Sequence, residues 1–286
     1  MSGVALGSLV IALREVLEAS LILAIILTTL SKTGRSDMRK YVVMGLAGSV
    51  TLGLATGYTV WYLYGSFPKK ELFEAIASLT AAAVLTWVIY WMAKTGPQLA
   101  WNITRKVSLI TSGIGLVVFT FIVTYREALE TVLFLVPYML SKPLDTVAGA
   151  LAGGIMAVGI AYMIYIAGYR ISLRRFFMLT SILLTFVASG ILGYGIHELA
   201  EVMEEDGIYT GVLLEEAYNL GISEGSLLHN NGLVGSILAV MFGYSVSMEW
   251  IRLIIQLGYL AILIPLILRA YGYRIGVKQA SQGHQG

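Results

Sequence analysis

Long runs of apolar residues follow one another along the chain, and short polar segments separate them. The runs cover residues 4–31, 41–65, 73–93, 108–140, 146–169, 176–199 and 250–268. Because about 20 helical residues cross the roughly 30 Å hydrocarbon core of a bilayer, each run is long enough to form a transmembrane helix. The pattern predicts an all-α polytopic membrane protein with seven transmembrane helices, in which residues 1–286 form a single membrane domain.

One further apolar stretch, residues 233–244, is shorter than these runs. It follows Asn230, Asn231 and Gly232. An apolar stretch of about 10–14 residues is more typical of a re-entrant or interfacial segment than of a membrane span. An eight-helix arrangement, in which this stretch also crosses the bilayer, is the alternative.

The composition indicates that a bilayer surrounds most of the side chains. Apolar residues make up 57% and charged residues 13% of the chain, and the mean hydropathy is +0.80. Soluble proteins have about 45–50% apolar and about 25% charged residues. The chain contains no cysteine, which excludes disulfides and thiolate metal sites. It also has no phosphate-binding glycine loop, so we expect neither a nucleotide nor a nucleic acid as a partner.

Lysine and arginine predict the orientation, because they accumulate in short cytoplasmic loops. With the N-terminus outside, only Lys69, Lys70 and Lys142 fall in outer loops. The basic residues that then fall inside are Lys32, Arg35, Arg39, Lys40, Lys94, Arg105, Lys106, Arg170, Arg174, Arg175, Arg269, Arg274 and Lys278. This distribution predicts the N-terminus outside and the C-terminus inside, with residues 271–286 as a cytoplasmic tail.

A duplicated motif divides the chain into two halves. Arg14-Glu15-Val16-Leu17-Glu18 recurs 112 residues later as Arg126-Glu127-Ala128-Leu129-Glu130. Because each unit would contain three helices, the two copies run in opposite directions, as in the inverted repeats common among transporters. We expect a first unit at 1–105, a second, inverted unit at 106–200 and an acidic outer loop at 201–232. Residues 233–270 would then hold the short segment and the last helix.

Each copy of the motif places one arginine and two glutamates on a single helix face, near the middle of an apolar run. Ionisable groups at the bilayer centre cost about 2.5–3.5 kcal/mol each unless they face one another or a wet cavity. Four carboxylates face only two guanidinium groups, and a hard cation would neutralise the surplus negative charge. We therefore predict a metal site with Glu15, Glu18, Glu127 and Glu130 as ligands, supported by Arg14 and Arg126.

The motifs are also compatible with two alternative roles. Each arginine could pair with the glutamate four residues later and lock two helices together, as in a structural or signalling subunit. Alternatively, the carboxylates could hold the metal of a membrane-embedded hydrolase, but no nucleophile or base is apparent at the same depth. We therefore expect a transporter rather than an enzyme.

A second acidic group precedes the last apolar run. Eight of the 17 acidic residues lie between Glu198 and Glu224, and no lysine or arginine occurs between Arg175 and Arg252. In the predicted topology this segment lies outside, where it is either a solvated acidic loop or a surface that raises the local concentration of cations. We expect one amphipathic helix near residues 211–221. The candidate outer capture site consists of His197, Glu198, Glu201, Glu204 and Glu205.

The two Arg-Glu-x-x-Glu motifs, in the first and fourth helices of a seven-helix protein, resemble those of the high-affinity iron permease family, also called oxidase-dependent iron transporters. The segment from Asn230 through Gly235 to Phe242-Gly243-Tyr244 is similar to the C-terminal region of that family. The resemblance implies iron uptake across the cytoplasmic membrane, with the four motif glutamates as translocation ligands and the two arginines as their structural and electrostatic partners. It also implies acidic motifs in the outer loop, for which Glu201, Glu204 and Glu205 are the nearest match.

The resemblance further implies which molecules the protein meets. Iron would be the transported substrate, with no cofactor. A separate extracytoplasmic iron-binding protein or ferroxidase would be the partner, because this chain has no oxidase domain. Related proteins credited with lead transport leave another metal cation, such as lead or a divalent transition metal, as the alternative substrate.

Overall fold

The computed structural model describes residues 3–167, 173–208, 211–223, 225–229 and 232–272. Within these ranges, seven long helices cover the seven apolar runs, with ends that differ by a few residues from the prediction. They are α1 (Gly3–Lys32), α2 (Arg39–Gly65), α3 (Lys70–Thr95), α5 (Gly113–Ser141), α6 (Pro143–Ala167), α7 (Leu173–Glu205) and α9 (Trp250–Ala270). Shorter elements are α4 (Leu99–Leu109), α8 (Leu233–Phe242) and 3₁₀ turns at Ser36–Met38, Gly96–Gln98 and Val212–Leu214.

Five helical segments of the described chain are long and apolar enough to cross a membrane. They are Ser36–Gly65, Lys70–Thr95, Pro143–Met163, Phe177–Glu205 and Trp250–Ala270. The protein is therefore a multi-pass membrane protein. The other two long helices, α1 with 30 residues and α5 with 29, have the required length but carry the charged motifs at their centres.

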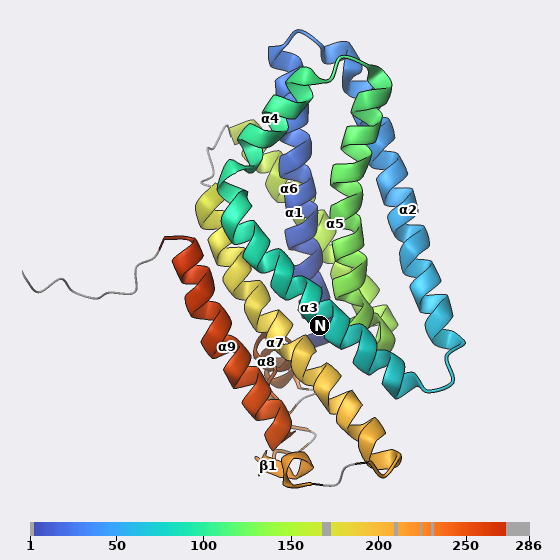
Figure 1. The fold of residues 1–286 in the computed structure, drawn as a ribbon, viewed down its shortest axis with the longest axis vertical. Helices are drawn as coiled ribbons and strands as arrows, with labels where there is room; N and C mark the ends of the chain where they lie inside the picture. Colours follow the sequence, from blue (N-terminus) through green and yellow to red (C-terminus); the bar gives the residue numbers. More distant parts are fainter. Residues whose placement is uncertain (1–2, 168–172, 209–210, 224, 230–231, 273–286) are drawn as a thin grey trace, which may run out of the picture.

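Each helix that carries a motif packs on a helix from the other half of the chain (Figure 1), and we call these two pairs the crossed pairs. α1 packs chiefly against α6, and α5 packs chiefly against α2. Glycines permit this close approach, because a Cβ on Gly153 of α6 would lie 2.2 Å from the Leu9 carbonyl oxygen of α1. A Cβ on Gly45 of α2 would likewise lie 2.6 Å from the Val117 carbonyl oxygen of α5. α1 and α5 also contact each other, and this contact brings the two motifs together.

The predicted span at 108–140 is interrupted near its start, so that part of the prediction was wrong. Ile110 is extended between α4 and α5, and the Ser112 side chain caps α5 by accepting a hydrogen bond from the Gly115 backbone N–H at 3.1 Å. α4 is a separate helix that buries Ile103 and Val107 against apolar side chains of α1. A hydrophobic run alone cannot reveal a break that is set by a capping hydroxyl group.

The segment that follows α7 also differs from the prediction, because it contains no amphipathic helix in its described part near residues 211–221. The 3₁₀ turn is followed by β1 (Glu216–Asn219), which pairs with the antiparallel strand β2 (Ser247–Glu249). The backbone therefore satisfies its hydrogen bonds with the segment that leads into α9 rather than within a helix.

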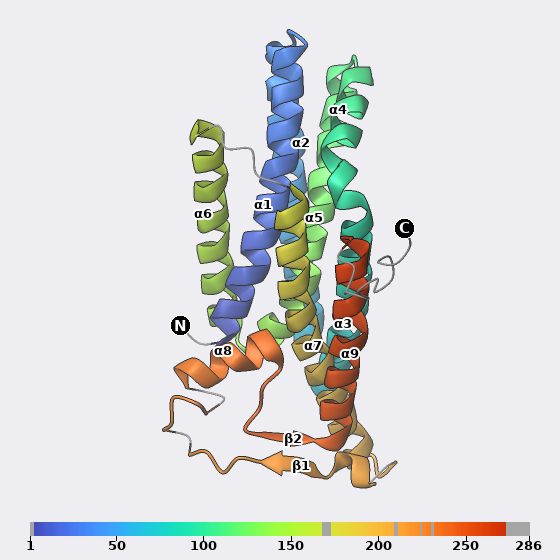
Figure 2. The same cartoon turned by 90° about the vertical axis from the view of Figure 1, so that its left-hand side faces the viewer.

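α8 lies across the bundle and contacts α1 and α7 (Figure 2). With 10 residues it is too short to cross the bilayer core. Phe242 at its end forms an edge-on contact with Phe186 of α7, with ring centroids 4.9 Å apart. These features agree with the predicted interfacial or re-entrant segment and disfavour an eighth span.

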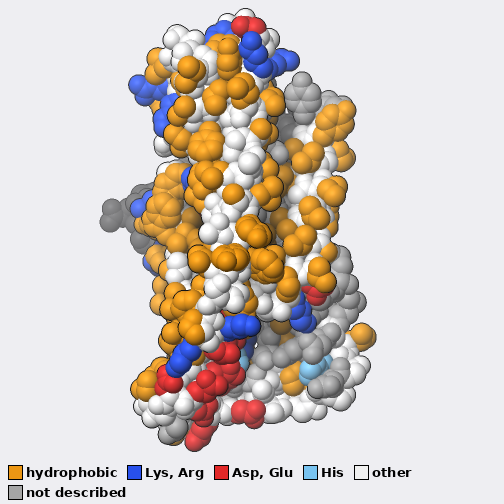
Figure 3. Space-filling model, turned by 90° about the vertical axis from the view of Figure 1, so that its right-hand side faces the viewer, with side chains coloured by type: hydrophobic (Ala, Val, Ile, Leu, Met, Phe, Trp, Pro, Cys, Tyr) orange, Lys and Arg blue, Asp and Glu red, His pale blue; other side chains and the backbone are white. Residues whose placement is uncertain are grey.

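Charged side chains gather at the two ends of the molecule, and hydrophobic side chains cover the surface between them (Figure 3). The exposed basic residues at one end are Lys32, Arg39, Lys40, Arg105 and Lys106. Exposed acidic residues at the other end include Glu201, Glu204, Glu205 and Asp206, and the exposed Lys69 pairs with Asp206 there. Large apolar side chains in between, such as Leu54 and Ile155, are more than two-thirds exposed (72% and 73%), as expected for a surface that faces lipid.

Candidate metal site

The two motifs meet in the interior of the helix bundle. α1 contributes Arg14, Glu15 and Glu18, whose exposed fractions are 2%, 1% and 1%. α5 contributes Glu127 and Glu130, which are 4% and 6% exposed. Ionised groups buried this deeply are stable only when paired or bound to a cation.

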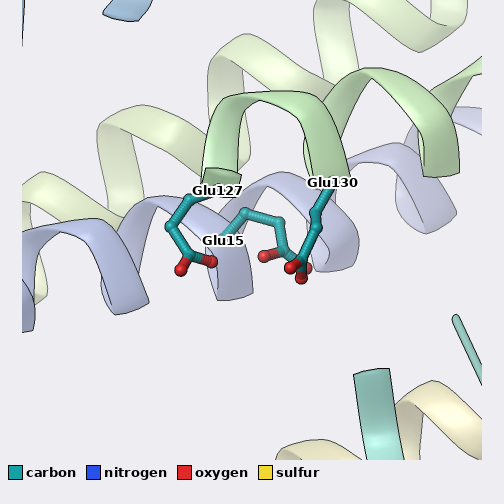
Figure 4. A group of neighbouring side chains, drawn as sticks. All are labelled: Glu15, Glu127 and Glu130. Carbon is teal, nitrogen blue, oxygen red and sulfur yellow. The ribbon is translucent and has the colours of Figure 1, made fainter. Parts of the chain in front are cut away.

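Three of the carboxylates, from α1 and α5, lie near one another (Figure 4). One oxygen from each of Glu15, Glu127 and Glu130 lies within 4.8 Å of the others. This is the one group of three or more candidate metal ligands found among the described residues. Glu18, the fourth predicted ligand, is outside this group but lies close enough to Glu127 to interact with it.

Arg14 is the main counter-charge of the cluster. Its Nη1 lies 2.5 Å from Glu15 Oε1, and its Nη2 donates a hydrogen bond of 3.1 Å to Glu18 Oε1. The same Nη1 lies 4.0 Å from Glu130 Oε2 on the other motif. One guanidinium group therefore connects carboxylates from both halves of the chain, which the planar fork of arginine makes possible.

Arg126 occupies a different environment, although it holds the same place in its motif. Its Nε donates a hydrogen bond of 2.7 Å to Glu130 Oε1. Its Nη2 is also 2.7 Å from that oxygen but is not directed well enough to form a hydrogen bond. The Arg126 side chain is 33% exposed, against 3% for Arg14. The guanidinium carbon lies over the ring of Trp91 in α3, 4.1 Å from the ring centroid.

Each of the four motif glutamates has one buried oxygen that accepts no hydrogen bond from the described residues. These atoms are Oε2 of Glu15, Glu18, Glu127 and Glu130. A buried acceptor left unsatisfied costs about 1–3 kcal/mol, and more when it is charged. Carboxylate oxygens are ligands for hard cations, so the chemistry of the converging Glu15, Glu127 and Glu130 fits a metal ion, whereas Glu18 lies outside that group.

Hydroxyl groups fix the α5 motif in place. Thr131 donates a hydrogen bond to the Glu127 carbonyl oxygen at 2.8 Å. Thr124, one turn before Glu127, donates one of 2.8 Å to the Ser49 hydroxyl of α2. The position of Glu127 is therefore tied both to its own helix and to the helix that packs against it.

Apolar side chains enclose the carboxylates along both helices. Ile11 precedes Arg14 in α1 and Phe134 follows Glu130 in α5, and both are fully buried in one cluster. Toward the C-terminal end of α1 and the N-terminal end of α5, a second cluster contains Ile22, Ile26, Leu30, Ile103, Val107 and Leu116. The site is thus separated from both ends of the bundle by packed apolar side chains, which strengthen electrostatic interactions within it.

The predicted outer capture residues lie apart from this site, at the acidic end. All five belong to the last turns of α7, so Glu201, Glu204 and Glu205 are helical rather than part of a loop. His197 Nδ1 lies 2.9 Å from Glu249 Oε1 of β2, and its Nε2 lies 3.5 Å from Glu201 Oε1. The hydrogen bond from His197 lowers the pKa of Glu249 below its usual value.

Glu74 is a polar residue at this end whose contacts with other helices the sequence does not predict. From the first turns of α3 it accepts hydrogen bonds from the Tyr64 hydroxyl of α2, at 2.7 Å, and from the Tyr194 hydroxyl of α7. It thus joins three helices beside Glu198, which is 9% exposed. A carboxylate early in a helix is ordinarily a partner of the helix dipole, and no signal in the sequence distinguishes the two roles.

Comparison with known proteins shows which family this chain is similar to. The profile of the iron permease FTR1 family matches residues 5–270. An uncharacterized protein of Archaeoglobus fulgidus is 47% identical over 93% of this chain and 96% of its own length. The ferrous iron permease EfeU of Yersinia pestis is 31% identical over 82% of this chain and 83% of its own length. EfeU of Escherichia coli O6:H1 is 30% identical over 82% of this chain and 84% of its own length. No solved structure matches significantly.

The unequal surroundings of the two arginines predict unequal effects on stability. Arg14→Ala leaves buried Glu15 and Glu18 without their counter-charge and should lower the free energy of unfolding by an amount on the order of 3–5 kcal/mol. Arg126→Ala should cost clearly less, because its side chain is one-third exposed and Glu130 keeps Arg14 nearby. Thermal unfolding of the purified variants in one detergent, without added metal, measures both. Equal losses would contradict the asymmetry.

Proposed function

The chain belongs to the iron permease FTR1 family, and from this premise we propose that it imports iron ions across the cytoplasmic membrane through the site formed by its two Arg-Glu-x-x-Glu motifs. The observation that carries the proposal is the buried convergence of Glu15, Glu127 and Glu130, whose oxygens lie within 4.8 Å of one another. The names of the relatives in Yersinia pestis and Escherichia coli favour ferrous iron as the substrate.

The unsatisfied carboxylate oxygens favour ion transport over a purely structural role of the motifs. A lock between two helices is most stable when each charge has a partner, whereas here four carboxylates face two arginines and each keeps one oxygen without a hydrogen bond. The family and the membrane-spanning helices favour a transporter over an enzyme. Another metal cation, such as lead or a divalent transition metal, is the alternative substrate, because carboxylate oxygens alone select weakly among divalent ions.

We assign the fold as an inverted repeat of three plus three helices followed by α9, with seven transmembrane helices. The crossed pairing supports this assignment: the first helix of each unit packs on the second helix of the other, as a two-fold axis requires. The separation of basic and acidic ends supports the basic end as cytoplasmic. The acidic end would then face a separate extracytoplasmic iron-binding or ferroxidase partner and receive the cation there.

Removing charge from the converging carboxylates should stop transport without unfolding the protein. Glu15→Gln and Glu127→Gln keep the shape of the side chain but remove its charge. We expect initial Fe²⁺ uptake into liposomes to fall by about 100-fold or more, since losing groups that only support metal ligands already costs about 10–100-fold in metal affinity. Zn²⁺, Mn²⁺ and Pb²⁺ added as competitors test the choice of metal. Anaerobic uptake by the purified protein is the measurement.

The control for this experiment is Glu71→Gln, which removes an exposed charge from the first turn of α3. It should transport at the parental rate. The proposal is wrong if the Glu15→Gln, Glu127→Gln double variant also transports iron at that rate.

Site-specific labelling tests the proposed topology. The chain has no cysteine, so single cysteines can be placed at Ser36, before α2, and at Glu216, in β1. An impermeant maleimide should label the first from the cytoplasmic side and the second from the outside. Labelling of both positions from one side would rule out seven spans with this orientation.

The exposed carboxylates at the end of α7 should capture cations without being required for passage. Replacing Glu201, Glu204 and Glu205 together by glutamine should raise the iron concentration at half-maximal uptake and flatten its dependence on ionic strength, because exposed charges are screened over about 8–10 Å in ordinary salt. Asp37→Asn, at the opposite end of the molecule, is the control. Loss of uptake at saturating iron would instead place these three residues in the obligatory path.

A further inference from the structure

The two arginines of the duplicated motif differ in what covers them. Arg14 is enclosed by carboxylates, with ion pairs to Glu15, Glu18 and Glu130. Arg126 bonds Glu130 alone among the motif glutamates and turns its face toward α3. The charged residues of the two motifs are the same, so a side chain outside the motifs that contacts one arginine and not the other is a candidate cause of this difference.

Trp91 is the side chain that meets Arg126 from outside the motif. The guanidinium carbon lies 4.1 Å from the ring centroid, well inside the roughly 6 Å range of a cation–π interaction. Trp91 is partly buried, and it packs against the apolar cluster that includes Ile89 and Phe134. The ring is therefore held by the core of the bundle and presents a fixed face to the arginine.

The chain supplies a comparison on the same helix. Trp87 lies one turn before Trp91 and stacks on it, with ring centroids 6.4 Å apart and an interplanar angle of 21°. Trp87 is 61% exposed, on the surface that faces lipid. Trp87 is on the same helix as Trp91 and is the same type of residue. However, it is the ring of Trp91 that lies under the guanidinium group of Arg126.

Arg126 has a competing position available. Arginine has five N–H donors, and Nη2 of Arg126 is buried and not well directed to any partner within the described residues. The unsatisfied oxygens of Glu127 and Glu130 are close by on the same helix face. A guanidinium group that turned onto them would satisfy the atoms that a metal ion needs, and it would therefore compete with the ion.

We propose that Trp91 is a positioning residue for cation binding: its ring holds Arg126 at the edge of the carboxylate cluster and leaves the unsatisfied Oε2 atoms of Glu127 and Glu130 available to ligate a divalent cation. This inference rests on the proposed function of the same site. The aromatic face, rather than the bulk of the side chain, performs the role, because only a π face attracts the guanidinium group.

Three substitutions separate the aromatic face from simple packing. Trp91→Leu removes the face but stays apolar, Trp91→Phe retains a weaker face, and Trp87→Leu removes the neighbouring exposed ring. In equilibrium dialysis of purified full-length protein with Fe²⁺ under anaerobic conditions, Trp91→Leu should weaken binding about tenfold (about 1.4 kcal/mol). Trp91→Phe should weaken binding less, and Trp87→Leu should leave it unchanged. Equal weakening by Trp91→Leu and Trp91→Phe would show that packing alone is involved and would overturn the inference.

A second background tests whether Trp91 acts through Arg126. In an Arg126→Gln protein there is no guanidinium group to hold, so adding Trp91→Leu should change the affinity less than twofold. Additive effects of the two substitutions would contradict a positioning role. In transport assays Trp91→Leu should raise KM while leaving kcat largely unchanged, whereas damage to the fold would lower the amount of active protein and hence the maximal rate.

The same measurements distinguish failure of this inference from failure of the proposed function. Dialysis is repeated with Mn²⁺ as a second probe. If the parental protein binds Mn²⁺ but neither binds nor transports Fe²⁺, the assignment of iron is wrong, and the Trp91 variants still decide the inference with Mn²⁺. If the parental protein binds neither cation, both fail. If it binds Fe²⁺ and Trp91→Leu binds equally well, only the inference fails.

Discussion

The burial of five ionisable side chains in an apolar bundle, with Arg126 one-third exposed beside them, is the constraint on which the rest of this structure depends. Two arginines and four glutamates leave two negative charges unbalanced, and each glutamate keeps a buried oxygen without a hydrogen bond. Removing such groups from water costs several kcal/mol per ion, and direct pairing offsets that cost only in part. In the proposed function a cation supplies the missing positive charge, which would link the affinity of the site to the stability of the fold.

The packing around the site follows from the same requirement. The motifs converge because α1 and α5 touch, but most of the contact of each helix is with another partner, α6 for α1 and α2 for α5. Glycines such as Gly45 and Gly153 bring these partners to backbone contact, which makes each crossed pair a closely packed unit. Apolar clusters close the path on both sides of the carboxylates. In the proposed function, one of these clusters must open for an ion to leave the site.

The sequence predicted the parts of this structure that hydropathy and charge determine. Each apolar run forms a long helix over most of its described length, and the motif glutamates of the two halves lie together, because charges in an apolar run can be buried only against one another. The break before α5 was missed because it depends on the Ser112 cap, and α4 because its apolar face is short. β1 and β2 form through pairing of segments far apart in the chain, which no local pattern indicates. Glu74 and Trp91 were not recognised because their roles depend on partners from other helices.

The duplication also does not make the four glutamates equivalent. Glu15 and Glu18 bond Arg14, and Glu130 bonds Arg126 while lying 4.0 Å from Arg14. Glu127 is the motif carboxylate that receives no hydrogen bond from an arginine among the described residues, although it is only 4% exposed. An arginine hydrogen bond occupies an oxygen and stabilises its charge without a metal, so in the proposed function the three bonded glutamates would gain less from a cation than Glu127 would. The duplication thus supplies two copies of one motif, and the unequal placement of their arginines leaves the α5 copy with the carboxylate that the proposed cation would stabilise most.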